Sequence, residues 1–387
     1  MKVGEVVQVE LDRVAHGGWC VGRVAGKVHF VAGGIPGELV AVKITSIAKG
    51  FNRAQVQQVI SASPDRIAAP CPIVTDCGGC AWQHVAGPRQ RQLKAAVIAE
   101  QLQRLAGIDW DGPVEEVTPV FGWRTRMDYA TDDQGNLGFH RRRSSDIVAL
   151  PSQGCLIAGH EQLAASWPEA ASVRVFRGAE TTVVVDGKVR QGPRQVQFRV
   201  AERDYLVDAQ GFWQPHTAAA EQLVAAVLAG LQVRAGESVA DLYCGVGLFA
   251  GALASHDARV VGLEGNRRAV ELARRNVPEA EFQVASLPKQ AARIPKSTDV
   301  VVLDPPRSGA GKAVVARIAA AGPRAVAYVA CDPAALARDL AHFQRLGYGL
   351  DGLSAYDLFP QTHHVECVAL LSPRRSTPTG VPTENGA

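Results

Sequence analysis

The stretch Ser238-Val-Ala-Asp-Leu-Tyr-Cys-Gly-Val-Gly-Leu-Phe249 decides the fold of this chain. Its first residues are mostly apolar, which is typical of a buried strand, and the Gly-Val-Gly turn that follows opens onto a helical pattern. Ligands of α/β proteins bind at the carboxyl edge of the sheet, where such turns lie. We therefore expect Asp241, Tyr243, Gly245 and Gly247 to border a cofactor site.

Strand and helix patterns alternate on both sides of this turn. Strands are expected near 238–243, 259–264, 299–304 and 325–330, and helices near 217–230, 266–277, 313–321 and 334–346. This alternation predicts a parallel sheet with helices on both faces. Two further apolar runs, 350–358 and 365–371, have no helix between them and predict a terminal antiparallel hairpin.

The upstream sequence has a different pattern. Short alternating strands separated by Gly17-Gly18, Gly33-Gly34 and Pro36-Gly37 predict a small β-barrel, and a helical stretch at 89–105 then precedes antiparallel strand patterns. We expect four parts: a barrel at 1–62, a central α+β domain at 63–210, a Rossmann-like α/β domain at 211–373, and a disordered tail rich in Pro, Thr and Gly at 374–387.

Composition limits the possible classes of protein. The 387 residues are 47% apolar and 20% charged, and no run is long and apolar enough to span a bilayer. The first residues lack the pattern of a signal peptide. We therefore expect a cytoplasmic protein that does not associate with a membrane. A net charge of only +3 means that contacts with nucleic acid must come from local patches.

Acidic residues end two of the expected strands. Glu264 can accept both hydroxyls of a cofactor ribose, and the prolines of Asp304-Pro-Pro-Arg307 form a stiff turn that directs Asp304 towards the same crevice. A dinucleotide fingerprint would place its third glycine one residue before Gly251, so binding of a pyrophosphate loses support. An enzyme that methylates amino groups remains an alternative, although such enzymes prefer an aromatic residue where Arg307 stands.

Cys331 ends the next strand and lies just before a helix. A helix N-terminus lowers the pKa of a thiol and favours the thiolate nucleophile, while the alternative is a small buried hydrophobic residue. Glu366 enters the last apolar run, where a carboxylate usually needs a functional reason. We take the two as a candidate nucleophile and a candidate base.

A separate group of cysteines lies upstream, at Cys71, Cys77 and Cys80, with Cys155 distant in sequence. A reducing compartment disfavours disulfides, so clustered cysteines indicate a metal site or catalysis. Four thiolates at this spacing favour a [4Fe-4S] cluster over a four-cysteine zinc site, which more often has two Cys-x-x-Cys pairs. Cys20, Cys244 and Cys367 are expected to be packing residues.

Together these motifs resemble the bacterial RNA uridine-C5 methyltransferases of the TRAM-containing, iron-sulfur class. The resemblance extends from the barrel to about residue 371 and implies S-adenosyl-L-methionine as methyl donor, contacted by Gln214, Tyr243, Glu264 and Asp304. It implies a [4Fe-4S] cluster on the four cysteines, and it assigns Cys331 as nucleophile and Glu366 as base. The implied product is 5-methyluridine in 23S ribosomal RNA, with transfer RNA as the alternative substrate, and we expect a monomer.

Two residues depart from the family pattern, which commonly has Asn at the positions of Asp332 and Leu248. On the barrel, Lys43, Lys49 and Arg53, with Phe51 between them, are candidates for contacting RNA, or they form an ordinary solvated strand. A non-catalytic RNA-binding iron-sulfur protein is the remaining alternative, and the intact Cys331 and Glu366 argue against it.

Overall fold

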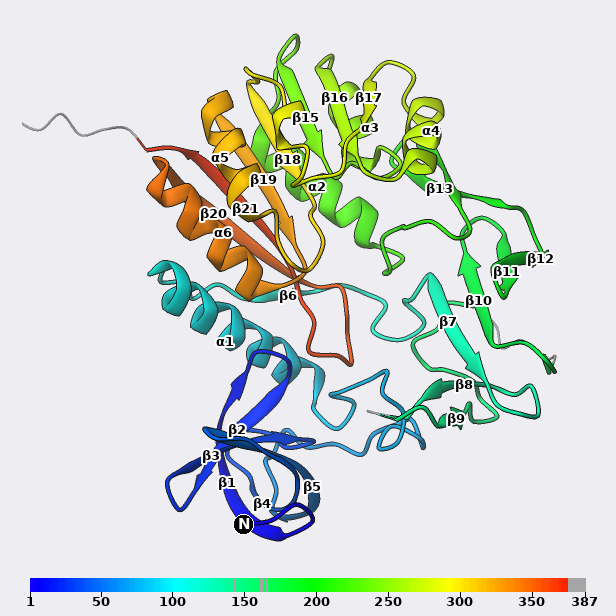
Figure 1. The fold of residues 1–387 in the computed structure, drawn as a ribbon, viewed down its shortest axis with the longest axis vertical. Coiled ribbons are helices and arrows are strands. Elements are labelled where there is room, and N and C mark those ends of the chain that lie inside the picture. Colours follow the sequence, from blue (N-terminus) through cyan, green and yellow to red (C-terminus); the bar gives the residue numbers. More distant parts are fainter. Residues whose placement is uncertain (142–143, 161–162, 164–165, 375–387) are drawn as a thin grey trace, which may run out of the picture.

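The computed structural model describes residues 1–141, 144–160, 163 and 166–374, so the tail expected at 374–387 falls almost wholly outside the described residues. Figure 1 shows the barrel at one end of the molecule and the large mixed sheet at the other. None of the helices in the described ranges is both long and apolar enough to cross a membrane.

An eight-stranded sheet holds the stretch that opened the sequence analysis. Its order is β17-β16-β15-β18-β19-β21-β20-β6. The strands are β15 (Ser238–Leu242), β16 (Arg259–Glu264), β17 (Glu281–Val284), β18 (Val300–Leu303), β19 (Ala325–Ala330), β20 (Tyr348–Asp357), β21 (Glu366–Pro373) and β6 (Val114–Glu116). The strands from β17 to β19 are parallel to one another, whereas β21 runs antiparallel to β19 and to β20. The expected parallel sheet and terminal hairpin are thus confirmed.

Alternating side chains of the strands build two cores on opposite faces of this sheet. Val300 and Val302 of β18 face one core, and Val301 and Leu303 face the other, because successive side chains of a strand point to opposite faces. The first core is covered by α2 (Ala219–Leu231), α3 (Leu248–Ala254) and α4 (Arg267–Asn276). The second is covered by α1 (Gly87–Ala106), α5 (Gly311–Ala321) and α6 (Pro333–Arg345).

The N-terminal strands form a closed barrel of order β1-β2-β3-β5-β4. They are β1 (Val6–Ala15), β2 (Trp19–Val24), β3 (Lys27–Ala32), β4 (Leu39–Ile47) and β5 (Phe51–Ser61). The barrel also packs against the rest of the chain, because Val14 and Ile35 share a core with Trp82, Leu93 and Val97. In Figure 1, α1 lies between the barrel and α6.

The remaining strands form two antiparallel sheets. The larger has the order β12-β11-β10-β7-β8-β9 and contains β7 (Arg126–Thr131), β8 (Leu137–His140), β9 (Ile147–Ala149), β10 (Ser172–Arg177), β11 (Thr181–Val185) and β12 (Lys188–Gln191). The smaller pairs β13 (Gln195–Val200) with β14 (Arg203–Asp208) and packs on the α2 side of the large sheet. Two elements from the range 63–210, α1 and β6, therefore pack with the C-terminal sheet rather than with these strands.

Candidate active site

The turn after β15 leaves open space at the carboxyl edge of the sheet. Tyr243, Gly245 and Gly247 all have positive φ angles, of 64°, 55° and 92°. A side chain built at Gly245 would meet no atom within 4 Å, and positive φ in a non-glycine residue such as Tyr243 tends to occur at functional sites. The backbone at this turn is therefore shaped for the close approach of a ligand.

Two carboxylates border this turn. Glu264 ends β16, and its carboxylate accepts hydrogen bonds from the backbone N–H groups of Gly245 at 3.1 Å and of Asn266 at 2.7 Å. Asp241 is fully buried, and one of its oxygens accepts the Ala250 N–H while the other has no hydrogen-bond partner in the described chain. Burial raises the pKa of Asp241 to about 8, with Asp304 and Glu264 adding to the effect.

Gln214 reaches the same edge from the segment before α2. Its amide Nε2 donates to Asp304 Oδ2 at 3.1 Å, and Asp304 directly follows the last residue of β18. Burial raises the pKa of Asp304 to about 7, and the hydrogen bond from Gln214 opposes that shift. The structure therefore brings together two residues that are 90 positions apart in sequence.

Strand pairing places Cys331 beside Glu366. Ala330 of β19 pairs with Cys367 of β21 in antiparallel register, so Cys331 and Glu366 follow at the same end of the two strands. Glu366 is only 4% exposed and Cys331 is half-buried. The two residues come to the same end of neighbouring strands although α6 and β20 lie between them in the sequence.

The expectation that a helix N-terminus lowers the pKa of the Cys331 thiol is wrong for this structure. Burial, followed by the charges of Glu366 and Asp304, raises that pKa to about 12, and Arg307 only partly opposes the effect. Burial and then the Asp304 charge also hold the pKa of Glu366 well above its ordinary value. Burial and the neighbouring carboxylates therefore disfavour the thiolate form of Cys331 in this structure.

A cavity of about 160 Å³ opens onto the Cys331 thiol. Its wall includes Arg307, whose guanidinium lies 3.3 Å from His364 Nε2. Burial and the neighbouring His363 lower the pKa of His364 to about 3, so its neutral ring accepts a hydrogen bond from Arg307. Both histidines line the cavity.

Sequence reasoning missed the residues of this wall that come from the barrel and from α1. His16 and Gly17 come from the turn between β1 and β2, and Lys94 comes from α1. No local sequence signal marks them, because they reach the cavity only through the docking of the barrel and α1.

The two departures from the family pattern have different environments. Asp332 is the N-cap of α6, and its Oδ1 accepts the Ala335 N–H at 2.8 Å. Leu248 is buried in the core on the α2 side of the sheet. Leu248 is therefore a packing residue of the core, whereas Asp332 lines the cavity next to Cys331.

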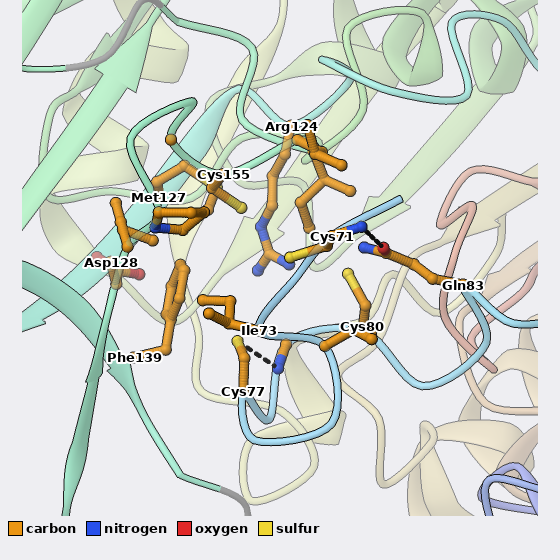
Figure 2. A pocket seen from close by; sticks show the side chains of 17 residues that line it. Cys71, Ile73, Cys77, Cys80, Gln83, Arg124, Met127, Asp128, Phe139 and Cys155 are labelled. Carbon is orange, nitrogen blue, oxygen red and sulfur yellow. Dashed lines mark hydrogen bonds between the residues drawn. The ribbon is translucent and has the colours of Figure 1, made fainter. Parts of the chain in front are cut away.

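Cys71, Cys77, Cys80 and Cys155 line one cavity of about 250 Å³. In Figure 2 their side chains surround the guanidinium of Arg124, which lines the same cavity and which sequence reasoning also missed. Burial raises the pKa of Cys80 to about 12, and the charges of the other three thiols add to the effect. In the conformation of the structure, no three His, Cys, Asp or Glu side chains of the described ranges, these cysteines included, lie close enough together to hold a metal ion.

The remaining cysteines are buried, as expected of packing residues: they are Cys20, Cys244 and Cys367.

On the barrel, the Arg53 guanidinium lies 5.8 Å from the centre of the Trp19 ring and 5.5 Å from that of Phe51. This group of one cation and two rings includes Trp19, which the sequence interpretation did not select.

The sheet order, the glycine turn and the acidic edge define a class I methyltransferase fold, and comparisons with known proteins agree. Residues 219–327 match the methyltransferase small domain, residues 1–57 match the TRAM domain, and residues 296–374 match the tRNA (uracil-5-)-methyltransferase family. The last match contains Asp304, Cys331 and Glu366. The chain belongs to the RNA uracil-C5 methyltransferases.

Full-length relatives show the same family. An uncharacterized RNA methyltransferase of Streptomyces avermitilis is 42% identical, over 96% of this chain and 99% of the relative. The 23S rRNA (uracil(1939)-C(5))-methyltransferase RlmD of Pseudomonas aeruginosa is 33% identical, over 95% and 94% of the two chains. The solved tRNA (uracil-54, C5)-methyltransferase of Pyrococcus abyssi, in complex with S-adenosyl-L-homocysteine, superposes with a TM-score of 0.73 at 25% identity, over 94% of this chain and 100% of that one.

Proposed function

We propose that this enzyme forms 5-methyluridine in 23S ribosomal RNA, with Cys331 as the nucleophile and Glu366 as the base. The observation that carries the proposal is the antiparallel pairing of β19 with β21, which brings a thiol and a buried carboxyl to one edge. Asp304 lies at the same edge, one strand away. The thiol also faces a cavity, as a group that reacts with a base must.

The chemistry of uracil explains this pair of residues. Carbon 5 is a poor nucleophile, so the Cys331 thiolate first adds to carbon 6 and turns carbon 5 into an enolate-like carbanion that takes up the methyl group. The Glu366 carboxylate then removes the carbon 5 proton, and the carbon 6–sulfur bond breaks to release Cys331 as a thiolate. A uridine inside folded RNA must leave its stack to reach this cavity.

Both groups must lose a proton before they can act. In the structure, burial and then neighbouring carboxylates favour the protonated forms of Cys331 and Glu366. Arg307 is the cation whose charge lowers the pKa of both groups. We assign Arg307 the role of favouring the reactive ionised forms.

The donor site fits the open turn after β15. S-adenosyl-L-methionine supplies the methyl group as a sulfonium cation, and carboxylates at its site favour that charge. Glu264 would hold the ribose hydroxyls, Gly245 and Gly247 would allow close approach, and Tyr243 would line the site. Gln214 and Asp304 would face the reactive end of the donor, and Asp241, with one unpartnered oxygen, would support the turn.

The identity of the RNA is supported by relatives of two kinds. The Pseudomonas aeruginosa relative acts on 23S ribosomal RNA, and the Pyrococcus abyssi neighbour acts on transfer RNA. We choose ribosomal RNA because RlmD is the more similar of these two in sequence, and transfer RNA is the second candidate.

Mass spectrometry of 5-methyluridine in ribosomal and transfer RNA, from cells with and without this protein, tests the choice. We expect one 5-methyluridine to disappear from 23S RNA. Loss from transfer RNA alone would favour the second candidate, and no loss from either would contradict the function.

We further propose that Cys71, Cys77, Cys80 and Cys155 hold a [4Fe-4S] cluster. The support is that four thiols line one cavity into which the Arg124 cation also projects, since a four-thiolate cluster is anionic. The cluster would join the 71–80 segment to the segment that carries Cys155. A cytoplasmic location and a monomeric state remain predictions.

A further inference from the structure

The β1–β2 turn of the barrel touches the residue next to the proposed nucleophile. His16 Nε2 lies 3.0 Å from Asp332 Oδ2, although 316 positions separate the two residues in sequence. The turn is held in place on both sides. Trp82 Nε1 donates to the Gly18 carbonyl at 3.3 Å, and a Cβ at Gly18 would come within 2.6 Å of His363.

Asp332 is an unfavourable neighbour for a thiolate. A carboxylate directly after the nucleophile repels the developing negative charge, and Asp332 is one of the charges that raise the pKa of Cys331, after burial, Glu366 and Asp304. Although burial would raise the pKa of Asp332 itself, the His16 hydrogen bond and the Ala335 N–H lower it. The carboxylate is therefore ionised beside a group that must also become negative.

We propose that His16 is a positioning residue that holds the Asp332 carboxylate on the barrel side and offsets its charge, so that Cys331 can form its thiolate. The geometry supports this role, because the two oxygens of Asp332 have separate partners. Oδ1 accepts the Ala335 N–H at the start of α6, and Oδ2 contacts the imidazole. The barrel thereby contributes to the chemistry of the site.

Other charged or titratable groups surround this pair, and the role of His16 must be separated from theirs. They come from α1, the loop after β18, α6 and the loop before β21, and they are Lys94, Arg307, Arg338, His363 and His364. Of the two partners, His16 is 41% and Asp332 23% exposed. Substitution of His16 is therefore compatible with folding.

The experiment measures alkylation of Cys331 by iodoacetamide in the full-length protein, quantified by mass spectrometry of the peptide that contains it, between pH 7 and 9. The rate follows the thiolate fraction. His16→Ala should slow alkylation roughly three- to tenfold, the size expected for the loss of one hydrogen bond to a charged group at a partly exposed site. His16→Lys should restore the rate, because the lysine ammonium can donate a hydrogen bond to the same carboxylate.

Asp332→Asn completes the test, because asparagine is an equally good N-cap but carries no charge. Alone it should speed alkylation by a similar factor, and in its presence His16→Ala should have no further effect. His256→Ala, an exposed histidine away from the site, is the matched control and should change nothing.

Three results would each overturn the proposal. They are an unchanged rate in His16→Ala, a His16→Lys protein that is as slow as His16→Ala, and an equal effect of His16→Ala with and without Asp332→Asn. The inference rests on the proposed role of Cys331, but alkylation reports the thiol without methyl transfer. A failure of the proposed function would appear separately, as methyl transfer that survives Cys331→Ala.

Discussion

The amide of Gln214 donates a hydrogen bond to Asp304 across 3.1 Å and so connects the segment before α2 to the end of β18. Burial raises the pKa of Asp304 to about 7, and this hydrogen bond keeps it from rising further. Near neutral pH, the charge at the proposed donor site therefore depends on Gln214.

Replacing Gln214 with Leu should raise the pKa of Asp304 above 7. Fewer molecules then carry the Asp304 carboxylate at pH 7, and affinity for the cationic donor should fall roughly two- to tenfold, the size of one hydrogen bond. The loss should shrink as pH rises and Asp304 ionises again. Calorimetric titration at pH 6.5 and 8.5 checks this, with Gln222→Leu on α2 as control. A loss that is constant with pH would contradict the assignment.

Substitutions of the two proposed catalytic residues should block the reaction at different steps. Cys331→Ala cannot form the bond to carbon 6, so it should give no methyl transfer and no denaturant-resistant complex with RNA. Glu366→Gln keeps the thiol but cannot take the carbon 5 proton, so a methylated covalent adduct should accumulate. A denaturing gel shows the adduct as a shifted protein band.

RNA that carries 5-fluorouridine provides the control for this pair of variants. It should trap the unaltered enzyme in the same band, because fluorine cannot leave as a cation. An adduct formed by Cys331→Ala would identify another nucleophile. Normal turnover by Glu366→Gln would place the base elsewhere, with Asp304 the nearest candidate.

Protein purified without oxygen should contain about four irons per chain and absorb in the visible range. Cys77→Ser should lower the iron content and the stability of the protein. Metal analysis and visible absorption measure both effects, and Cys20→Ser, which alters a buried cysteine of the barrel, is the control for iron content. Stoichiometric zinc without iron would contradict the cluster.

The group formed by Arg53, Trp19 and Phe51 should contribute to RNA affinity. Arg53→Gln removes one cation, so binding should weaken and the slope of log affinity against log salt should fall by roughly 0.7 to 0.9. Fluorescence anisotropy over a salt series measures the slope. Lys188→Gln, on an exposed strand of the antiparallel sheet, should leave the slope unchanged.

The buried ion pair between Lys94 and Asp357 should matter more for stability than an exposed pair on the same helix. The two side chains are 0% and 5% exposed, so Lys94→Met would leave a buried carboxylate without its cation. We expect a loss of about 3–5 kcal/mol in the free energy of unfolding. Glu100→Gln, which breaks the more exposed pair with Arg13, should cost less than about 1 kcal/mol. Denaturant unfolding compares the two variants.

The alternating apolar runs were enough to predict the sheet and most of its helices. Helix α6, for example, begins at Pro333 and ends at Arg345, one residue from each expected boundary. Short strands were harder to predict. Strand β6 was missed because its three residues are too few to show an alternation of apolar and polar side chains. Its place at the sheet edge depends on pairing with β20, in which Val114 pairs with Ala355, 241 positions away.

The site was predictable where single strands end and unpredictable where separate parts of the chain meet. Asp304 and Cys331 could be placed from their own strands, and Glu366 from a charge that enters an apolar run. His16 and Arg124 could not, because only tertiary packing brings each of them to its site. The direction of the Cys331 pKa shift was missed for the same reason, since it depends on burial and then on carboxylates from other parts of the chain.

The position of β21 between β19 and β20 has a consequence for synthesis on the ribosome. The strand that carries Glu366 is the last of the sheet to be made, yet it fills an interior place with neighbours on both sides. Until it emerges, the place between β19 and β20 is unfilled, and the nascent chain has Cys331 without Glu366, its proposed base. If Glu366 is the base, the enzyme becomes competent only once translation has passed this strand, after the barrel and the turn that follows β15 have been made.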